Sequence, residues 1–136
     1  MSLSGRGQVL AELGENRRAV EELNLALQTL TITSAANSSW AEWYQEAEAV
    51  VRDGQGFALA GLGETAQAMN EFETSIGLSP ENAWVYHNRA QVHDRAGSSN
   101  SAVADYEKAL AKQGPALSPL RREHAQTRLR DLSNKP

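Results

Sequence analysis

The chain has 136 residues, 40% of them apolar and 22% charged, which is typical of one ordinary globular domain. It contains no cysteine, which excludes disulfides, zinc–thiolate sites and thiol nucleophiles, and its net charge of −4 argues against nucleic-acid binding. The N-terminal residues lack the apolar stretch of a signal peptide and no run approaches the ~20 apolar residues of a membrane span, so we expect a cytoplasmic protein without membrane contact.

Three segments share one spacing of small and large residues. Each begins at a small residue and has glycine seven positions later, then alanine after five more, a large apolar residue after four and a small residue after three. These positions are Gly7, Gly14, Ala19, Leu23 and Ala26 in the first segment, Gly56, Gly63, Ala68, Phe72 and Ser75 in the second, and Ala90, Gly97, Ala102, Tyr106 and Ala109 in the third. Intervals of three, four and seven place side chains on one helical face, and glycine ends a helix without strain. Each segment is therefore predicted to form a helix, a tight turn and a second helix.

An insertion separates the first two segments. Their glycines lie 49 residues apart, 15 more than the 34 residues between the second and third glycines. Residues 34–39 have the composition of a polar turn, and residues 40–60 contain no proline and are rich in helix formers. We expect the insertion to extend the first helix of the second unit to about 30 Å, at ~1.5 Å per residue. Trp40 and Trp43 share one face of this extension, where they either cover the first hairpin or form an exposed aromatic interface.

The last segment carries the start signal of another helix. Ser118 and Pro119 are typical of an N-cap and a first helical turn. Leu120, Leu129 and Leu132 fall loosely on one side, with arginines on the other. Stacked hairpins need a polar-faced final helix over the last one. We predict such a capping helix at residues 117–132.

The three segments resemble the tetratricopeptide repeat family, whose period is 34 residues. Pro80 ends the second unit where the family pattern has its proline. The resemblance implies an all-α fold, a right-handed superhelical stack of antiparallel helix hairpins with about seven helices. The whole chain, 1–136, would be a single domain of this type, divided into repeat one (1–33), the insertion and helix extension (34–48), repeat two (49–82), repeat three (83–116), the capping helix (117–132) and a tail (133–136).

No constellation of residues predicts catalysis. The string G-x-G-x-x-A at residues 61–66 falls in a helix–helix turn, whereas dinucleotide binding needs it between a strand and a helix. His87 and His93 are six residues apart and point to different sides of a helix, so they make no metal-ligand pair. We therefore expect no catalytic residue, no cofactor and no metal, and a protein that is not an enzyme.

The resemblance also implies a binding function. Such proteins bind peptides or partner helices in a concave groove lined mainly by the first helix of each unit. Carried over to matching positions, the groove residues here are Asp53, Phe57, Trp84, His87, Asn88, Gln91 and Arg95. One family subset holds the C-terminal carboxylate of heat-shock chaperones with lysine, asparagine and arginine. This chain has Ser4, Gln8 and Gly54 at three of those places, so chaperone tails are not the expected partner.

We therefore predict a protein–protein interaction module that holds a protein or peptide partner. One alternative is a self-assembling structural unit, which would associate through the two tryptophans or through oppositely charged ends. Residues 1–80 carry 4 Lys/Arg and 11 Asp/Glu, a net charge of −7, and residues 81–136 carry 9 and 6, a net charge of +3. The other alternative is a regulatory domain excised from a larger enzyme.

Overall fold

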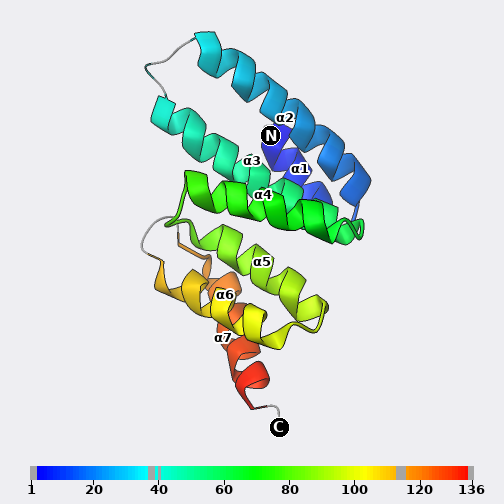
Figure 1. Cartoon of the computed structure of the whole chain (residues 1–136), viewed down its shortest axis with the longest axis vertical. Helices are drawn as coiled ribbons and strands as arrows, with labels where there is room; N and C mark the ends of the chain where they lie inside the picture. Colours follow the sequence, from blue (N-terminus) through cyan, green and yellow to red (C-terminus); the bar gives the residue numbers. More distant parts are fainter. Residues whose placement is uncertain (1–2, 37–38, 40, 113–115, 135–136) are drawn as a thin grey trace. The chain divides into compact units, whose positions relative to one another are not determined.

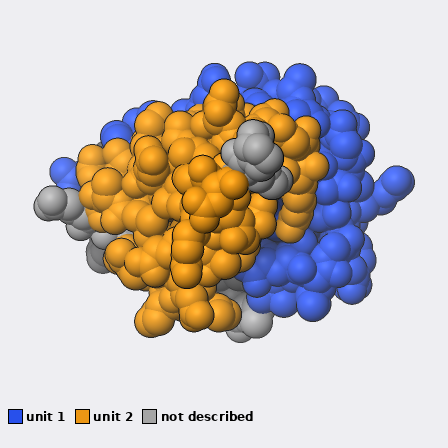
Figure 2. All heavy atoms as spheres, turned by 90° about the horizontal axis from the view of Figure 1, so that it is seen from below, with its two compact units in different colours: residues 1–80 blue, residues 81–136 orange. Residues whose placement is uncertain are grey.

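A computed structural model describes residues 3–36, 39, 41–112 and 116–134, and the regular elements of these residues are α-helices joined by short turns. The prediction of an all-α protein built from antiparallel hairpins is confirmed for this part of the chain (Figure 1). The chain divides into two compact units, residues 1–80 and 81–136 (Figure 2). Unit 1 contains α1 (Leu3–Glu12), α2 (Asn16–Ala36), α3 (Ala41–Gly61) and α4 (Thr65–Leu78), and unit 2 contains α5 (Ala83–Arg95), α6 (Ser99–Ala111) and α7 (Pro119–Ser133).

A left-handed glycine makes the turn of each hairpin. Gly14, Gly63 and Gly97 have φ of 80°, 82° and 78° and follow α1, α3 and α5. Residues other than glycine are strained at such backbone angles, because their Cβ atom crowds the backbone. The glycines predicted from the repeat spacing to end these helices do so.

The repeated spacing also places the buried residues correctly. Leu23, Phe72 and Tyr106 are 0% exposed, as are the alanines that precede each of them by four residues. The small residue at the head of a segment allows close approach: a Cβ on Gly56 would lie 2.7 Å from the ring of Phe72. The large side chain of the second helix therefore fits against the first helix because that helix has no side chain there.

The insertion lengthens two helices. The predicted extension of the first helix of the second unit is confirmed by α3, whereas the polar turn predicted at residues 34–39 was wrong in its first half. Both α2 and α3 have 21 residues, and α2 runs through residues 34–36, where a turn was expected. The hydroxyls of Thr29, Thr31 and Thr33 donate to carbonyls four residues earlier, so these polar side chains are satisfied within the helix. The last two residues of α2 are alanines, and this fits a helix here because alanine is the strongest helix former.

The core of unit 1 lies where α3 packs against α1, α2 and α4. One cluster joins Ala11, Ala19 and Ala58, and a second joins Leu23, Ala26 and Val51. Buried Ser75 of α4 donates to the carbonyl of Ala49 of α3 at 2.6 Å, which satisfies this buried hydroxyl where the two helices pack.

In unit 2, α5 and α6 form a hairpin, and α7 packs chiefly on α6. The helix α7 begins as predicted, with Pro119 in its first turn and the Ser118 hydroxyl accepting from the Arg121 N–H. Its apolar face differs from the prediction, because Leu120 is 77% exposed while Ala125 and Leu132 are buried. The stripe that faces α5 and α6 spaces residues by three or four: Arg121, Ala125, Arg128 and Leu132.

Candidate functional site

Five of the predicted groove residues form one stripe along α5. Trp84, His87, Asn88, Gln91 and Arg95 recur at helical spacing, so they share a face of this helix. The N-cap Asn82 anchors the stripe by accepting from the Trp84 N–H at 3.0 Å. The structure places this face against α7. Residues that were predicted to contact a partner therefore contact α7 of the same chain.

Trp84 and Asn88 hold the beginning of α7. The indole N–H of Trp84 donates to the carbonyl of Ala116 at 3.1 Å. The guanidinium of Arg121 lies 4.4 Å from the centre of the Trp84 ring and donates to Asn88 Oδ1 at 3.2 Å. A cation over an indole face with a hydrogen bond beside it fixes both side chains.

His87 is buried, with 1% of its surface exposed. Arg121 Nη1 donates to His87 Nδ1 at 3.3 Å, so the ring proton sits on Nε2, which donates to His124 Nδ1 at 3.1 Å. Burial, with smaller contributions from the charge of Arg121 and from electrostatic interaction with His124, lowers the pKa of His87 to about 4. Burial and the charge of Arg128 also lower the pKa of His124. Both imidazoles are therefore neutral at pH 7, and His87 belongs to the α5–α7 contact.

A pocket of about 270 Å³ lies beside these histidines. Its lining residues come from α5, α6 and α7: Gln91, Asp94, Arg95, Tyr106, His124 and Arg128. Arg128 donates two hydrogen bonds to the Asp94 carboxylate, at 2.7 and 2.9 Å, and the Tyr106 hydroxyl donates to the same carboxylate at 3.2 Å. Burial and the nearby Asp94 carboxylate raise the pKa of Tyr106, so its hydroxyl stays protonated. Asp94 therefore holds one wall of the pocket in place.

The remaining lining groups are hydrogen-bond donors that reach the solvent. Arg95 and His124 are exposed, and Gln91 is half-buried. Guanidinium, imidazole N–H and amide groups converge on one cavity from α5 and α7. The arrangement can hold an acceptor-rich group such as a carboxylate or a row of carbonyls.

Three residues of this region were missed by the sequence analysis, namely Arg121, His124 and Arg128. All three come from α7, whose arginines were expected to face the solvent. His124 is 37 residues from His87, and no local pattern links the two. A buried helix stripe that contains arginine does not register as an apolar face, so the sequence offered no signal for it.

The other predicted site residues lie in unit 1. Asp53 is buried, with 4% exposed, and Phe57 packs partly against Ala11, Ala19 and Ala58. Trp43 is 57% exposed, and its ring meets that of Tyr44 edge-on with centres 5.0 Å apart. Trp43 therefore leaves more than half of its surface to the solvent, while Trp40 lies outside the described residues.

The described residues offer neither a metal cluster nor a membrane-spanning helix. They contain no group of three or more His, Asp or Glu side chains that could hold a metal ion. Among them, no helix is both long enough and apolar enough to cross a membrane.

Residues 85–111 match the family model of the tetratricopeptide repeat. The matched segment covers most of α5, all of α6 and the glycine turn between them. No curated protein sequence matches the chain. The family resemblance is therefore confirmed for the hairpin that carries the candidate site, and the number of repeats in the chain stays a prediction.

Proposed function

We propose that this chain, which carries a tetratricopeptide repeat at residues 85–111, holds a segment of a partner protein and does no chemistry of its own. Tetratricopeptide repeats generally mediate protein–protein interactions, so the family supports a binding role. The observation that carries the proposal is the donor-lined pocket between α5, α6 and α7. Fold alone does not determine function, whereas the chemistry of this pocket favours a particular kind of bound group.

The pocket favours a partner segment that presents a carboxylate or several carbonyls. Gln91, Arg95 and His124 carry donor groups, and the carboxylate of Asp94 is bound by Arg128 and Tyr106. A cavity of about 270 Å³ is below the ~300–1,000 Å³ of typical small-molecule pockets. It therefore suits one acidic side chain or a chain terminus from a longer segment that is held elsewhere by surface contacts.

Double substitution of two donors that line the pocket tests this proposal. The variant Gln91→Ala/Arg95→Ala should weaken binding of the partner by about 10- to 100-fold, because hydrogen bonds to a charged acceptor contribute ~1.5–3 kcal/mol. Arg130→Ala is the matched control, since Arg130 is an exposed arginine of α7 that does not line the pocket. Partners captured on the immobilised wild-type chain are identified, and the affinity of each variant is then measured by calorimetry.

Peptides from the captured partner separate charge from shape. Replacing each glutamate or aspartate of the bound segment by its amide should lower the affinity for the wild type and have little effect on the double variant. If the double variant retains the same partners at unchanged affinity, with unchanged helical content, the pocket is not the binding site. Asp53 and Phe57 stay predictions from the sequence, and the proposal does not depend on them.

A further inference from the structure

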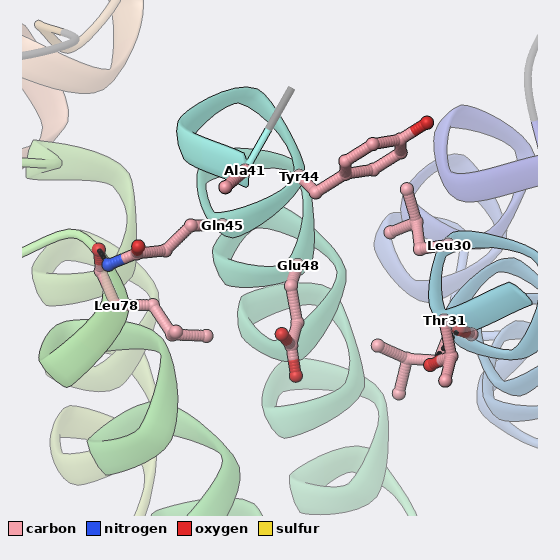
Figure 3. A pocket seen from close by; sticks show the side chains of 8 residues that line it. Leu30, Thr31, Ala41, Tyr44, Gln45, Glu48 and Leu78 are labelled. Carbon is pink, nitrogen blue, oxygen red and sulfur yellow. Dashed lines mark hydrogen bonds between the residues drawn. The ribbon is translucent and has the colours of Figure 1, made fainter. Parts of the chain in front are cut away.

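Unit 1 contains a second pocket that shares no residue with the candidate site. Its volume is about 390 Å³, and it lies over the first turns of α3 between α2 and the end of α4 (Figure 3). Leu27 and Leu30 form an apolar wall from α2, and Leu78 forms one from α4. Gln45 and Glu48 of α3 supply polar groups between these walls, and the Gln45 amide donates to the Leu78 carbonyl at 3.1 Å.

The insertion supplies the α3 side of this pocket, because Ala41, Tyr44, Gln45 and Glu48 lie within residues 34–48. The helix α1 has 10 residues and α4 has 14, whereas α2 and α3 each have 21. Large apolar side chains of α2 and α3 lie in the solvent here: Ile32, just before the insertion, is 72% exposed, and Trp43, within it, is 57% exposed. An apolar opening rimmed by polar side chains is typical of a surface that another protein segment covers.

The charge around the unit 1 pocket restricts which kind of segment can bind there. Residues 24–48, which form the second half of α2, the connection and the first turns of α3, contain three glutamates and no lysine or arginine. Glu48 is paired with Arg52 at 3.1 Å and Glu46 accepts from Ser79, while Glu42 is exposed at the start of α3. Two copies of this surface would repel each other face to face. The complementary occupant is an aliphatic side chain with basic neighbours.

The start of α7 has this chemistry. Leu120 is the large apolar residue with the greatest exposed fraction among the described residues, at 77%, and the adjacent Arg122 is also exposed. Unit 2, to which they belong, carries a net charge of +3 against −7 for unit 1. We propose that the unit 1 pocket binds the Leu120–Arg122 turn of a second copy of this chain.

Such a contact joins two different surfaces, so each copy keeps one unused pocket and one unused α7 turn. Association of this head-to-tail kind continues into rings or open chains rather than stopping at a symmetric dimer. The contact uses one apolar anchor and a few rim charges, which is typical of a weak interaction with a dissociation constant in the high micromolar range, on the order of 100 μM. It does not rest on the function proposed above, because it uses other residues.

Sedimentation of the full chain over a dilution series tests the anchor. The average mass of the wild type should rise with concentration, and the rise should be smaller at high salt because the charges are screened. Leu120→Ser should weaken association by about 10-fold or more through loss of the buried side chain. Leu13→Ser is the matched control, because Leu13 is 70% exposed at the other end of the chain, and it should leave association unchanged.

Charge reversal tests the orientation. Glu42→Lys and Arg122→Glu should each reduce self-association, and an equimolar mixture of the two variants should restore it, because each altered end then meets an opposite charge. A chain that stays monomeric at millimolar concentration overturns the proposal. Association that Leu120→Ser leaves intact overturns it in favour of a symmetric apolar contact. The chain could also stay monomeric and yet bind an added peptide of residues 117–124. The pocket would then accept such a segment but not from a second copy, which overturns the proposal in favour of a basic segment of another protein.

Discussion

Single small residues determine how closely the helices of each hairpin approach. A Cβ on Gly7 would lie 2.5 Å from Leu23, and one on Gly56 would lie 2.7 Å from Phe72. Gly77 of α4, by contrast, has open space around it. The repeated spacing of the sequence identified the first two glycines as contact positions, because each precedes its large partner by 16 residues.

Alanine at Gly56 should destabilise the chain, whereas alanine at Gly77 should stabilise it. The added methyl group of Gly56→Ala meets three atoms of the Phe72 ring, and overpacking of this kind costs ~1–3 kcal/mol. Gly77→Ala adds a methyl group in open space and gains about 0.5 kcal/mol of helix propensity. Chemical denaturation measures both free energies of unfolding. Equal effects of the two substitutions would contradict this packing.

His87 should make stability depend on pH. Its folded-state pKa of about 4 is below the ordinary value of ~6.5, so the unfolded chain takes up the proton first. Neutral His87 therefore adds about 1–3 kcal/mol to the free energy of unfolding. This stabilisation is fully present above pH ~6.5 and is lost as the pH falls toward 4. Thermal melts between pH 7 and pH 5 measure the slope, which should be smaller in His87→Gln. An unchanged slope in this variant would show that the titrating group lies elsewhere.

At the scale of the element, α7 is held by polar side chains rather than by an apolar stripe. Arg121 and Arg128 alternate with Ala125 and Leu132 along its packed face. The helical periodicity of these four positions is present in the sequence, but the arginines conceal it. Long side chains with planar donor groups reach α5 and bind His87, Asn88 and Asp94, which an apolar helix could not do.

Loss of the Asp94 charge should loosen α7. Asp94→Asn removes the bidentate pair with Arg128, so the backbone amides of α7 should exchange about 10-fold faster or more, while those of α1–α4 keep their rates. Asp131→Asn is the control, because Asp131 meets the same arginine at 3.5 Å and is exposed; its effect should be within ~0.5 kcal/mol. Equal exchange in both variants would mean that α7 is held by its apolar contacts alone.

The insertion is the second element-level feature, and its length was predicted more accurately than its effect. The sequence placed 15 extra residues near 34–48 and assigned them to α3, whereas the structure shares them between α2 and α3. Helix propensity alone did not decide where α2 ends, because Ser-Ala-Ala at residues 34–36 is compatible with a turn and with a helix. The part of the insertion in α3 supplies Ala41, Tyr44, Gln45 and Glu48 to the lining of the unit 1 pocket.

Across the whole molecule, composition and charge restrict the function without assigning a partner. The matched repeat at residues 85–111 belongs to a family that generally mediates protein–protein interaction, and it does not identify the partner. The predicted groove drew its residues from α3 and α5, which belong to different compact units. The unequal charges of these units, −7 and +3, underlie the head-to-tail contact proposed above.

The fold class, the glycine turns and the buried positions of the hairpins could be predicted from the sequence. These features depend on intervals of three, four and seven residues, which are local and repeat along the chain. The contacts of Arg121, His124 and Arg128 with α5 required the tertiary structure. They join residues more than 30 positions apart, and polar side chains leave no periodic apolar signal that would reveal their burial.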